Sequence, residues 1–455
     1  MPKPYRHALC LYPYRRELPK VGFFPPLGLE YIAAALKPYA RKIDIVDLRK
    51  DRSHEPFIRP ETGLVCVSCN WHHEEKKYAE IINSLPAEPT VIVGGRHATM
   101  NADRFIDEIP RIDILVRGDG EEIIREIAEG VPLEKIDGIT WRKNGRAVYN
   151  RPRDYGEVDN DIVPDRGLRR HRYTMQIGDV DLGIPIDLIA MTRGCPYRCK
   201  FCTFARNEHS TPRPFTARPP ESIIRELRDV EARVLVAADD NFTHDLDRLE
   251  SVCDALIDSR LNKMLIVNGR SDIAKRPRVV RKMHDAGVRA IYIGVESARD
   301  ETLEYYGKGI TTETFRRRME VLRKVKIWYH GTFIIGAPGE GEEGMLEIAD
   351  YSHELGLDSI GVSRLRCPKN TPLYDELAGK PGFHVADDGK VHSDEFPRGR
   401  LKKIQNEILR RFYTPRQILK IADKVLYNKI VPLRFYLELF ALPARFAVRK
   451  LISPR

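Results

Sequence analysis

Three cysteines fall within eight residues of the chain, at Cys195, Cys199 and Cys202, in the pattern Cys-x-x-x-Cys-x-x-Cys. Thiolates are the protein ligands of iron–sulfur clusters, and three of them leave one iron of a four-iron cluster without a protein ligand. An iron with an open position can bind a second molecule. A zinc site completed by a histidine such as His209, or three unrelated buried thiols, would show the same spacing.

The elements that must position this motif repeat at a regular interval. Apolar runs that predict strands occupy residues 188–191, 234–238, 264–267, 290–294, 331–335 and 359–362. Amphipathic helical patterns fill the gaps, and each strand–helix step has the size of a βαβ unit, about 30 residues. A closed eight-step barrel needs about 250 residues, so six steps predict a partial (β/α)6 barrel with functional residues just after its strands.

The N-terminal part alternates short apolar runs with helical patterns in the same way. Strands are predicted at residues 7–12, 43–47, 64–68, 90–93 and 112–117, with helices at 27–36 and 78–85. Buried strands that alternate with helices indicate a doubly wound, Rossmann-like parallel sheet. Such sheets bind ligands at the carboxyl ends of their strands.

The two regular regions are separated by residues 137–186, which read as a linker. A hairpin is predicted around Asn144-Gly145, and the residues after it are rich in Arg, Asp and Pro. The sequence therefore predicts an α/β chain in four parts. They are an N-terminal domain at 1–136, the linker at 137–186, the partial barrel at 187–375 and a basic, mainly helical region at 376–455.

The cysteine motif, placed after the first of six strand–helix steps, resembles that of the radical S-adenosylmethionine enzymes. The resemblance implies that Cys195, Cys199 and Cys202 hold a 4Fe-4S cluster. In that family the open iron binds the amino and carboxylate groups of S-adenosylmethionine, and electron transfer cleaves the molecule to a 5′-deoxyadenosyl radical. An electron donor such as flavodoxin or ferredoxin is then an expected partner.

The same resemblance assigns S-adenosylmethionine contacts to residues after the later strands. Asp239 and Asp240 correspond to the family's acceptors for the ammonium group, and Arg270 to a partner for the carboxylate. The remaining implied contacts are Glu296 with Ser297 at the ribose, and Gly336, Pro338 and Phe201 beside the adenine.

Four N-terminal segments, at residues 25–30, 47–49, 93–99 and 117–121, together resemble the cobalamin-binding domain of cobalamin-dependent radical S-adenosylmethionine enzymes. Glycines after strands permit close approach of a bulky cofactor to the backbone. The resemblance implies cobalamin contacts at Leu27, Gly28, Asn70, Trp71, His72, Gly94, Gly95, Gly118 and Glu121.

One feature departs from many cobalamin domains, because the Asp-x-His-x-x-Gly motif that places a histidine beneath cobalt is absent. The first strand is followed instead by Tyr12-Pro13-Tyr14-Arg15-Arg16. The loop at residues 70–73 is the nearest candidate to cover the lower face of the corrin. Solvated histidines at the start of a helix explain His72 and His73 equally well.

Cys10, Cys66 and Cys69 admit a second interpretation, since methylthiotransferases carry another iron–sulfur cluster on three N-terminal cysteines. Cys10 and Cys66 lie inside apolar strands, where a free cysteine acts as a small hydrophobe, so we favour a structural role. Cys367 follows the sixth strand and lies within reach of the barrel mouth, but a structural thiol is the simpler reading.

The resemblance implies a methyltransferase that acts on an unactivated carbon of a substrate that the sequence does not identify. Relatives with these two domains also catalyse rearrangement, cyclisation or coupling. A methylthiotransferase and a cobalamin-binding sensor with a vestigial barrel are further alternatives.

The net charge of +10 is confined to one end of the chain. Residues 400–455 contain 14 of the 76 basic residues and three of the 66 acidic ones, which leaves 62 bases against 63 acids elsewhere. The catalytic body therefore favours no polyanionic partner such as nucleic acid. The tail interleaves bases with apolar residues, which suits a packed subdomain, a peripheral membrane contact or an acidic protein partner. Without a visible signal sequence, a cytoplasmic location is expected.

Overall fold

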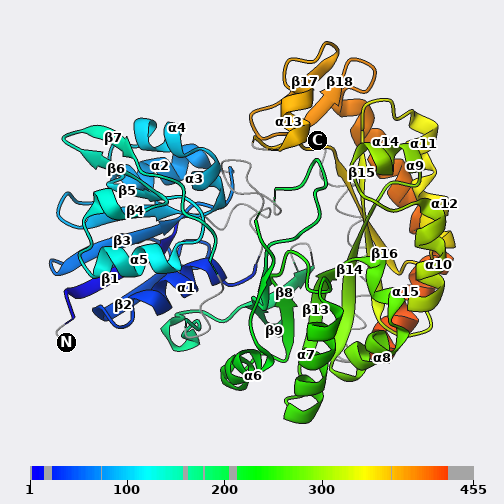
Figure 1. Ribbon diagram of the computed structural model, residues 1–455, viewed down its shortest axis with the longest axis horizontal. Coiled ribbons are helices and arrows are strands. Elements are labelled where there is room, and N and C mark those ends of the chain that lie inside the picture. The colour runs from blue at the N-terminus through cyan, green and yellow to red at the C-terminus, as the bar shows by residue number, and fades with distance from the viewer. Residues whose placement is uncertain are drawn as a thin grey trace.

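The computed structural model of the chain describes residues 3–14, 23–72, 74–156, 162–177, 180–203, 213–369 and 371–428. His73, His209 and the part of the basic tail beyond residue 428 lie outside these ranges. Figure 1 shows two sheets side by side, an N-terminal one in blue and cyan and a larger, curved one in green and yellow.

The N-terminal sheet has seven strands in the order β2-β1-β3-β4-β5-β6-β7. Five of them are parallel and bury apolar residues: β1 (Tyr5–Tyr12), β2 (Ala40–Asp47), β3 (Thr62–Ser68), β4 (Thr90–Gly94) and β5 (Ile114–Val116). The strand order reverses beside β1, which makes a switch point where such sheets bind ligands. The doubly wound domain expected from the alternating pattern is confirmed.

Helices cover both faces of this sheet. α1 (Leu27–Leu36) and α5 (Glu121–Ala128) pack side by side on one face (Figure 1). The other helices of the domain are α2 (Glu75–Asn83), α3 (Arg96–Met100) and α4 (Ala102–Glu108). Strands buried on both faces explain why their sequences are continuous apolar runs rather than alternating ones.

The predicted hairpin forms and extends the N-terminal sheet. β6 (Ile139–Lys143) pairs antiparallel with β5, and β7 (Arg146–Tyr149) pairs with β6. Its turn has positive φ at Asn144 (52°) and Gly145 (78°), as a two-residue primed turn requires. The boundary expected at residue 136 therefore falls inside the sheet, because local turn signals do not tell a linker from an edge hairpin.

The second sheet is an open half-barrel in the order β16-β15-β14-β13-β12-β9-β8. Six parallel strands form it: β9 (Val180–Ile189), β12 (Val234–Ala237), β13 (Met264–Gly269), β14 (Val288–Glu296), β15 (Trp328–Ile335) and β16 (Ser359–Arg364). This confirms the partial barrel of six steps. β8 (Thr174–Ile177) adds an antiparallel edge strand that the sequence did not predict, and β9 begins before the expected residue 187.

The strands of the half-barrel alternate with helices on its outer side (Figure 1). They are α6 (Pro220–Asp229), α7 (Leu246–Ser259), α8 (Pro277–Asp285), α9 (Asp300–Tyr305), α10 (Thr312–Leu322), α11 (Glu342–Leu346) and α12 (Ile348–Glu354). Their apolar faces bury a continuous core against the strands. This packing leaves the loops after the strands free to carry chemistry.

The described part of the C-terminal region packs on the half-barrel. α13 (Pro372–Leu377) and the hairpin of β17 (Phe383–Val385) and β18 (Val391–Ser393) precede α14 (Arg398–Phe412) and α15 (Pro415–Asn428). α14 buries Leu401, Ile404, Ile408 and Phe412 against α11, α12 and β16. A packed subdomain thus accounts for the apolar face of α14. Within the described residues, no helix is both long and apolar enough to cross a membrane.

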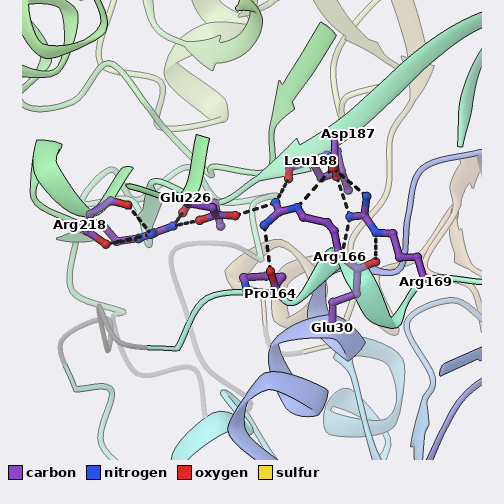
Figure 2. Close-up of polar contacts among 10 residues, drawn as sticks. Glu30, Pro164, Arg166, Arg169, Asp187, Leu188, Arg218 and Glu226 are labelled. Carbon is purple, nitrogen blue, oxygen red and sulfur yellow. Dashed lines mark hydrogen bonds and ion pairs between the residues drawn. The ribbon is translucent and has the colours of Figure 1, made fainter. Parts of the chain in front are cut away.

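A chain of buried charges joins the two sheets. Its members alternate in sign and run from α1 through the connecting segment to the half-barrel, in the order Glu30, Arg169, Asp187, Arg166, Glu226 and Arg218 (Figure 2). The Nε of Arg169 lies 2.6 Å from Glu30 Oε1, and its Nη2 lies 2.7 Å from Asp187 Oδ1. Arg166 continues the chain to Glu226 at 2.6 Å. The two domains are therefore connected by paired charges as well as by the covalent chain.

The Glu226→Gln variant is expected to unfold at a lower denaturant concentration than the native chain. The Glu226 side chain is fully buried between Arg166 and Arg218, so its neutral replacement leaves two buried guanidinium groups under-compensated. Breaking a buried pair in this way costs about 3–5 kcal/mol. The measurement is the free energy of unfolding from urea titration. Glu407→Gln, which breaks the exposed pairs with Arg410 and Arg411, is the control and should change little. Equal effects of the two substitutions would contradict the prediction.

Candidate active site

The cysteine motif lies in the loop after β9, the first parallel strand of the half-barrel. β10 (Thr192–Arg193) leads into the motif and pairs with β11 (Thr216–Ala217), which closes the base of the loop. Gly194 then turns the chain with φ 79°, and a Cβ at this position would lie 2.1 Å from the carbonyl oxygen of Pro214. Only glycine fits such a turn, so the backbone itself directs Cys195 out of the strand.

Backbone hydrogen bonds hold the loop against more distant parts of the half-barrel. The N–H of Lys200 donates to the carbonyl of Tyr306 at 2.9 Å, and the N–H of Leu373 donates to the carbonyl of Lys200 at 3.3 Å. Within the motif, the N–H of Cys202 donates to the carbonyl of Cys199 at 3.1 Å. The middle of the motif is therefore anchored between α9 and α13.

The three thiols differ in exposure, with Cys199 buried and Cys195 and Cys202 partly exposed. Asn241 Nδ2 donates to Cys195 Sγ at 3.8 Å, and burial raises the pKa of Cys195. In the part of the chain that the structure describes, no three His, Cys, Asp or Glu side chains gather around one metal-ion position. A cubane cluster takes each thiolate on a different iron, and three soft thiolates on one anchored loop suit that group.

The acidic pair after β12 supports the loop instead of pointing away from it. Asp239 is buried and accepts the backbone N–H groups of Met191 and Thr192 at 2.6 and 2.9 Å, and burial raises its pKa to about 7. Asp240 accepts the N–H of Gly194 at 2.8 Å. Both N–H groups reach Oδ1 of Asp239, so this oxygen positions the loop, and the expected contact of Asp239 with an ammonium group stays a prediction. Asp240 lines a cavity, as described below.

Arg270 follows β13 and lies against the cysteine loop. Its guanidinium is stacked over the Tyr197 ring, 3.7 Å from the ring centroid, and its Nε donates to Asp272 Oδ2 at 3.1 Å. Its Nη2 donates to the carbonyl of Lys308 at 3.0 Å. The expected role of Arg270 as a carboxylate partner stays a prediction, and its position beside the motif is consistent with it.

Glu296 ends β14 in a strained conformation. Its φ of 76° is unusual for a residue with a Cβ, and the register between β14 and β15 shifts at this point. The carboxylate is buried and lies 2.8 Å from Lys308 Nζ, while the adjacent Ser297 is buried and accepts the N–H of Arg299. Strain held by a buried ion pair is typical of functional sites. Glu296 also lines the interdomain cavity described below.

The turn after β15 is held by its own acidic residue. Glu340 Oε2 accepts the N–H groups of Gly336 at 2.8 Å and of Ala337 at 3.1 Å, so these donors are already paired. Gly336 and Gly339 both have positive φ, and Pro338 lies between them. The amides of Gly336 and Ala337 therefore stabilise the turn, and the expected position of Gly336 and Pro338 beside the adenine stays a prediction.

Glu340→Gln is expected to remove part of the pH dependence of stability. Burial raises the pKa of Glu340 from 4.5 to about 7, so ionisation is disfavoured in the folded state. The folded chain therefore loses stability as pH rises from about 4.5 to 7, and a neutral glutamine avoids this loss. We expect the unfolding free energy to change between pH 5 and 8 by about 2 kcal/mol less in the variant. Glu343→Gln, at an exposed neighbouring position, should leave the native profile unchanged, and an identical profile for Glu340→Gln would contradict the prediction.

A first cavity, called here the sheet-edge cavity, has a volume of about 360 Å³ at the carboxyl ends of β3, β4 and β5. Its lining includes apolar side chains and five glycines, at Gly28, Gly94, Gly95, Gly118 and Gly120. A Cβ added at Gly28 would meet no atom within 4 Å. A glycine-lined cradle over an apolar slot at a switch point fits a corrin with a nucleotide tail.

Most of the expected cobalamin residues line this cavity, but not all. Asn70 and Glu121 do so together with four of the glycines, whereas Leu29 takes the place expected for Leu27. Leu27 is buried in the core, since the helix turns the following residues toward the cavity. Tyr155, Arg193, Thr203 and Arg213 line the cavity as well and were not expected from the sequence. Asp240, which was expected at S-adenosylmethionine, also lies in this lining.

Trp71 and His72 line a second cavity and not the first. This interdomain cavity, about 580 Å³, lies between the N-terminal domain and the half-barrel and includes Phe201 and Glu296. The hydroxyl of Tyr14 accepts the N–H of Trp71 at 2.7 Å, which fixes the loop. His72 Nε2 lies 3.7 Å from a carboxylate oxygen of Asp388. The two cavities share a wall formed by Asn70, Arg96, Met100 and Thr203.

The remaining cysteines occupy structural positions. Cys10 and Cys66 are neighbours in the register of β1 and β3, and both are buried. Burial raises the pKa of Cys69, and burial with its neighbour Cys10 raises that of Cys66, so neither thiol is a ready thiolate. Cys367 is buried too, and burial raises its pKa to about 11. These positions support the reading of all four as small hydrophobes.

Comparison with known proteins agrees with this division of the chain. A B12 binding domain model matches residues 21–128, and a model of the Radical SAM superfamily matches residues 189–352. An uncharacterized methyltransferase of Pyrococcus horikoshii is 26% identical over 350 residues, which are 73% of this chain and 74% of that protein. An anaerobic magnesium-protoporphyrin IX monomethyl ester cyclase of Rubrivivax gelatinosus is 23% identical over 383 residues, 79% of this chain and 67% of the cyclase.

A solved structure extends the similarity to the arrangement of the domains. The radical S-adenosylmethionine methyltransferase TsrM of Kitasatospora setae, with cobalamin and a 4Fe-4S cluster bound, superposes with a TM-score of 0.68. The superposition covers 90% of this chain and 86% of TsrM at 20% identity. At that identity the superposition establishes a common fold.

Proposed function

We propose that this chain, which belongs to the cobalamin-dependent radical S-adenosylmethionine enzymes, transfers a methyl group to an unactivated carbon of its substrate. One observation carries the proposal: the glycine-lined sheet-edge cavity and the cysteine loop both border the interdomain cavity, through Asn70, Arg96 and Thr203. A substrate in that cavity lies between the two cofactor sites.

The cofactors of this family are a 4Fe-4S cluster, S-adenosylmethionine and cobalamin, and the residues described above suit them. Cys195, Cys199 and Cys202 would supply the thiolates, and the glycines that line the sheet-edge cavity would let the corrin approach the backbone. When bound, these groups supply a carbon radical and a transferable methyl group. An electron donor such as flavodoxin or ferredoxin is part of the proposal.

The chain itself positions these groups and shields them from water. Asp239 and Asp240 hold the backbone entrance of the cysteine loop, and Asn241 donates a hydrogen bond to the Cys195 sulfur. Glu296 presents a carboxylate at the cavity wall, where it lies 2.8 Å from Lys308 Nζ. The charge chain from Glu30 to Arg218 holds the two domains in register on either side of the cavity. Such positioning is what the protein adds to cofactor chemistry.

The proposal is tested by supplying S-adenosylmethionine with an isotopic label in its methyl group. The reconstituted enzyme is incubated without oxygen, with a strong reductant and with small-molecule and lipid extracts of its native host. Label in a new carbon-bound methyl group, together with 5′-deoxyadenosine, supports methyl transfer. Deoxyadenosine without label in any product would overturn the methyl transfer while retaining the radical.

That second outcome corresponds to an alternative favoured by one of the comparisons. The cyclase of Rubrivivax gelatinosus is similar to this chain over 79% of its residues, and its name describes a cyclisation. A cyclisation or another rearrangement uses the same cluster and the same interdomain cavity. The methyltransferase from Pyrococcus horikoshii matches at higher identity, 26% against 23%, and favours methyl transfer as the first proposal.

A further inference from the structure

The interdomain cavity carries an excess of positive charge at one end. Arg364 is the last residue of β16, and Arg366 and Lys369 follow it, and all three line the cavity. Arg96 contributes a fourth cation from the opposite, N-terminal domain. These four cations come from two domains and face one volume of about 580 Å³.

The carboxylates of the same cavity do not neutralise this excess. Glu296 is paired with Lys308 at 2.8 Å, and Asp388 is paired with Lys390 and lies 3.7 Å from His72. Asp387 is the third acid in the lining. One carboxylate thus remains for the three cations at the end of β16.

The guanidinium groups of Arg364 and Arg366, at the end of β16, form no ion pair with the described residues of the protein and can therefore bind a ligand. Arg366 Nη2 donates to the backbone carbonyl of Asp388 at 2.6 Å, which orients the group without cancelling its charge. The side chain of Arg364 is half-buried and makes no hydrogen bond or ion pair with any residue in the described ranges. A half-buried guanidinium without a partner is costly unless an anion completes it.

The electrostatics of the opposite wall agree with this geometry. Burial and the nearby Arg366 and Arg213 lower the pKa of Arg96, and Asp240 and Cys202 oppose that shift. Arg96 lines the interdomain cavity from the N-terminal domain, and Arg366 lines it from the segment after β16. The near neutrality of residues 1–399 as a whole conceals this local accumulation of positive charge.

We infer that the substrate carries an anionic group, a carboxylate or a phosphate, which Arg364, Arg366 and Lys369 bind at the end of β16. The inference rests on the proposed function, because it takes the interdomain cavity as the substrate site. It narrows the substrate class to anionic molecules whose reacting carbon reaches the space beside Phe201 and Glu296. Planar guanidinium groups bind both oxyanions through paired hydrogen bonds.

The test is direct binding and does not require turnover. Benzoate, phenyl phosphate and benzyl alcohol are titrated calorimetrically into the reconstituted enzyme saturated with S-adenosylmethionine, because Phe201, Trp71 and Tyr374 suit an aromatic probe. We expect one or both anions to bind and the neutral alcohol to bind at least tenfold more weakly. The stronger anion distinguishes a carboxylate substrate from a phosphate one.

Variants connect that binding to the proposed residues. Arg364→Gln should weaken anion binding by roughly tenfold or more, and Arg364→Lys should retain part of it. Arg317→Gln, an exposed position on α10, is the matched control and should bind as the native chain does. Equal affinity for the alcohol, no saturable anion binding with S-adenosylmethionine present, or no effect of Arg364→Gln would overturn the inference. None of these outcomes touches the methyl-labelling experiment, so the two proposals fail separately.

Discussion

Cys199→Ala is expected to lower the iron content from about four atoms per chain to background and to abolish 5′-deoxyadenosine formation. Cys199 is the buried middle cysteine of a loop anchored on both sides through Lys200. With only two thiolates left, the loop cannot ligate three irons of the cluster, so iron is lost. Deoxyadenosine formation is lost as well, because the cluster and not the protein carries out the radical chemistry. We expect deoxyadenosine formation to fall by roughly a thousandfold or more.

Cys253→Ala is the matched control for that variant. Cys253 is also a buried thiol, but it lies on α7 in the core of the half-barrel, away from the loop. Iron content and deoxyadenosine formation should remain at native levels, apart from a modest loss of stability. Native activity in Cys199→Ala, measured on anaerobically reconstituted protein, would remove the basis of the proposed function.

Gly28→Leu is expected to weaken cobalamin binding without destabilising the fold. Gly28 is the second residue of α1 and lines the sheet-edge cavity, and an added Cβ meets no atom within 4 Å. A Cβ at this position therefore meets no neighbour, and replacing a helical glycine by leucine improves helix propensity by up to about 1 kcal/mol. The leucine side chain would then occupy space that the corrin needs, at a cost of about 1–3 kcal/mol, or roughly 5- to 150-fold in affinity.

Gly28→Ala is a substitution of intermediate size at the same position, because its single methyl group occupies far less of the cavity than leucine does. Its affinity should lie between those of the native chain and Gly28→Leu, and the melting temperature of both variants without cobalamin should not fall. The measurements are spectroscopic titration with hydroxocobalamin and thermal unfolding. Unchanged affinity in Gly28→Leu would place the corrin elsewhere.

The sequence predicted the architecture well because buried parallel strands and their helices have strong local patterns. The six apolar runs of the half-barrel became β9, β12, β13, β14, β15 and β16. The edge strands β6, β7 and β8 were missed or read as linker, since a half-exposed hairpin joins a sheet only through distant partners. Pairing across such distances leaves no periodic signal in the sequence.

The candidate site was predicted by position more reliably than by role. The acidic pair after β12 does lie beside the cysteine loop, yet Asp239 accepts backbone N–H groups there. Asn241, two positions later, is the residue that contacts Cys195. The predicted strand ends identify which residues gather at one edge of the sheet. What each side chain binds depends on its rotamer and on the nearby backbone N–H groups, which the sequence does not reveal. Arg213 and Tyr155, which line the sheet-edge cavity, follow no strand of the parallel sheets and left no signal.

The charge chain between the domains also constrains how this sequence can evolve. Glu30 and Arg218 end the chain with one partner each inside it, whereas Arg169, Asp187, Arg166 and Glu226 each contact two members of opposite sign. A substitution that removes the charge of one of these four residues leaves each of its two oppositely charged partners with one counter-ion fewer. We expect such a substitution to persist only together with a second substitution that restores the charge balance. We therefore expect positions 30, 166, 169, 187, 218 and 226 to covary among homologues, although they span almost 200 residues of sequence.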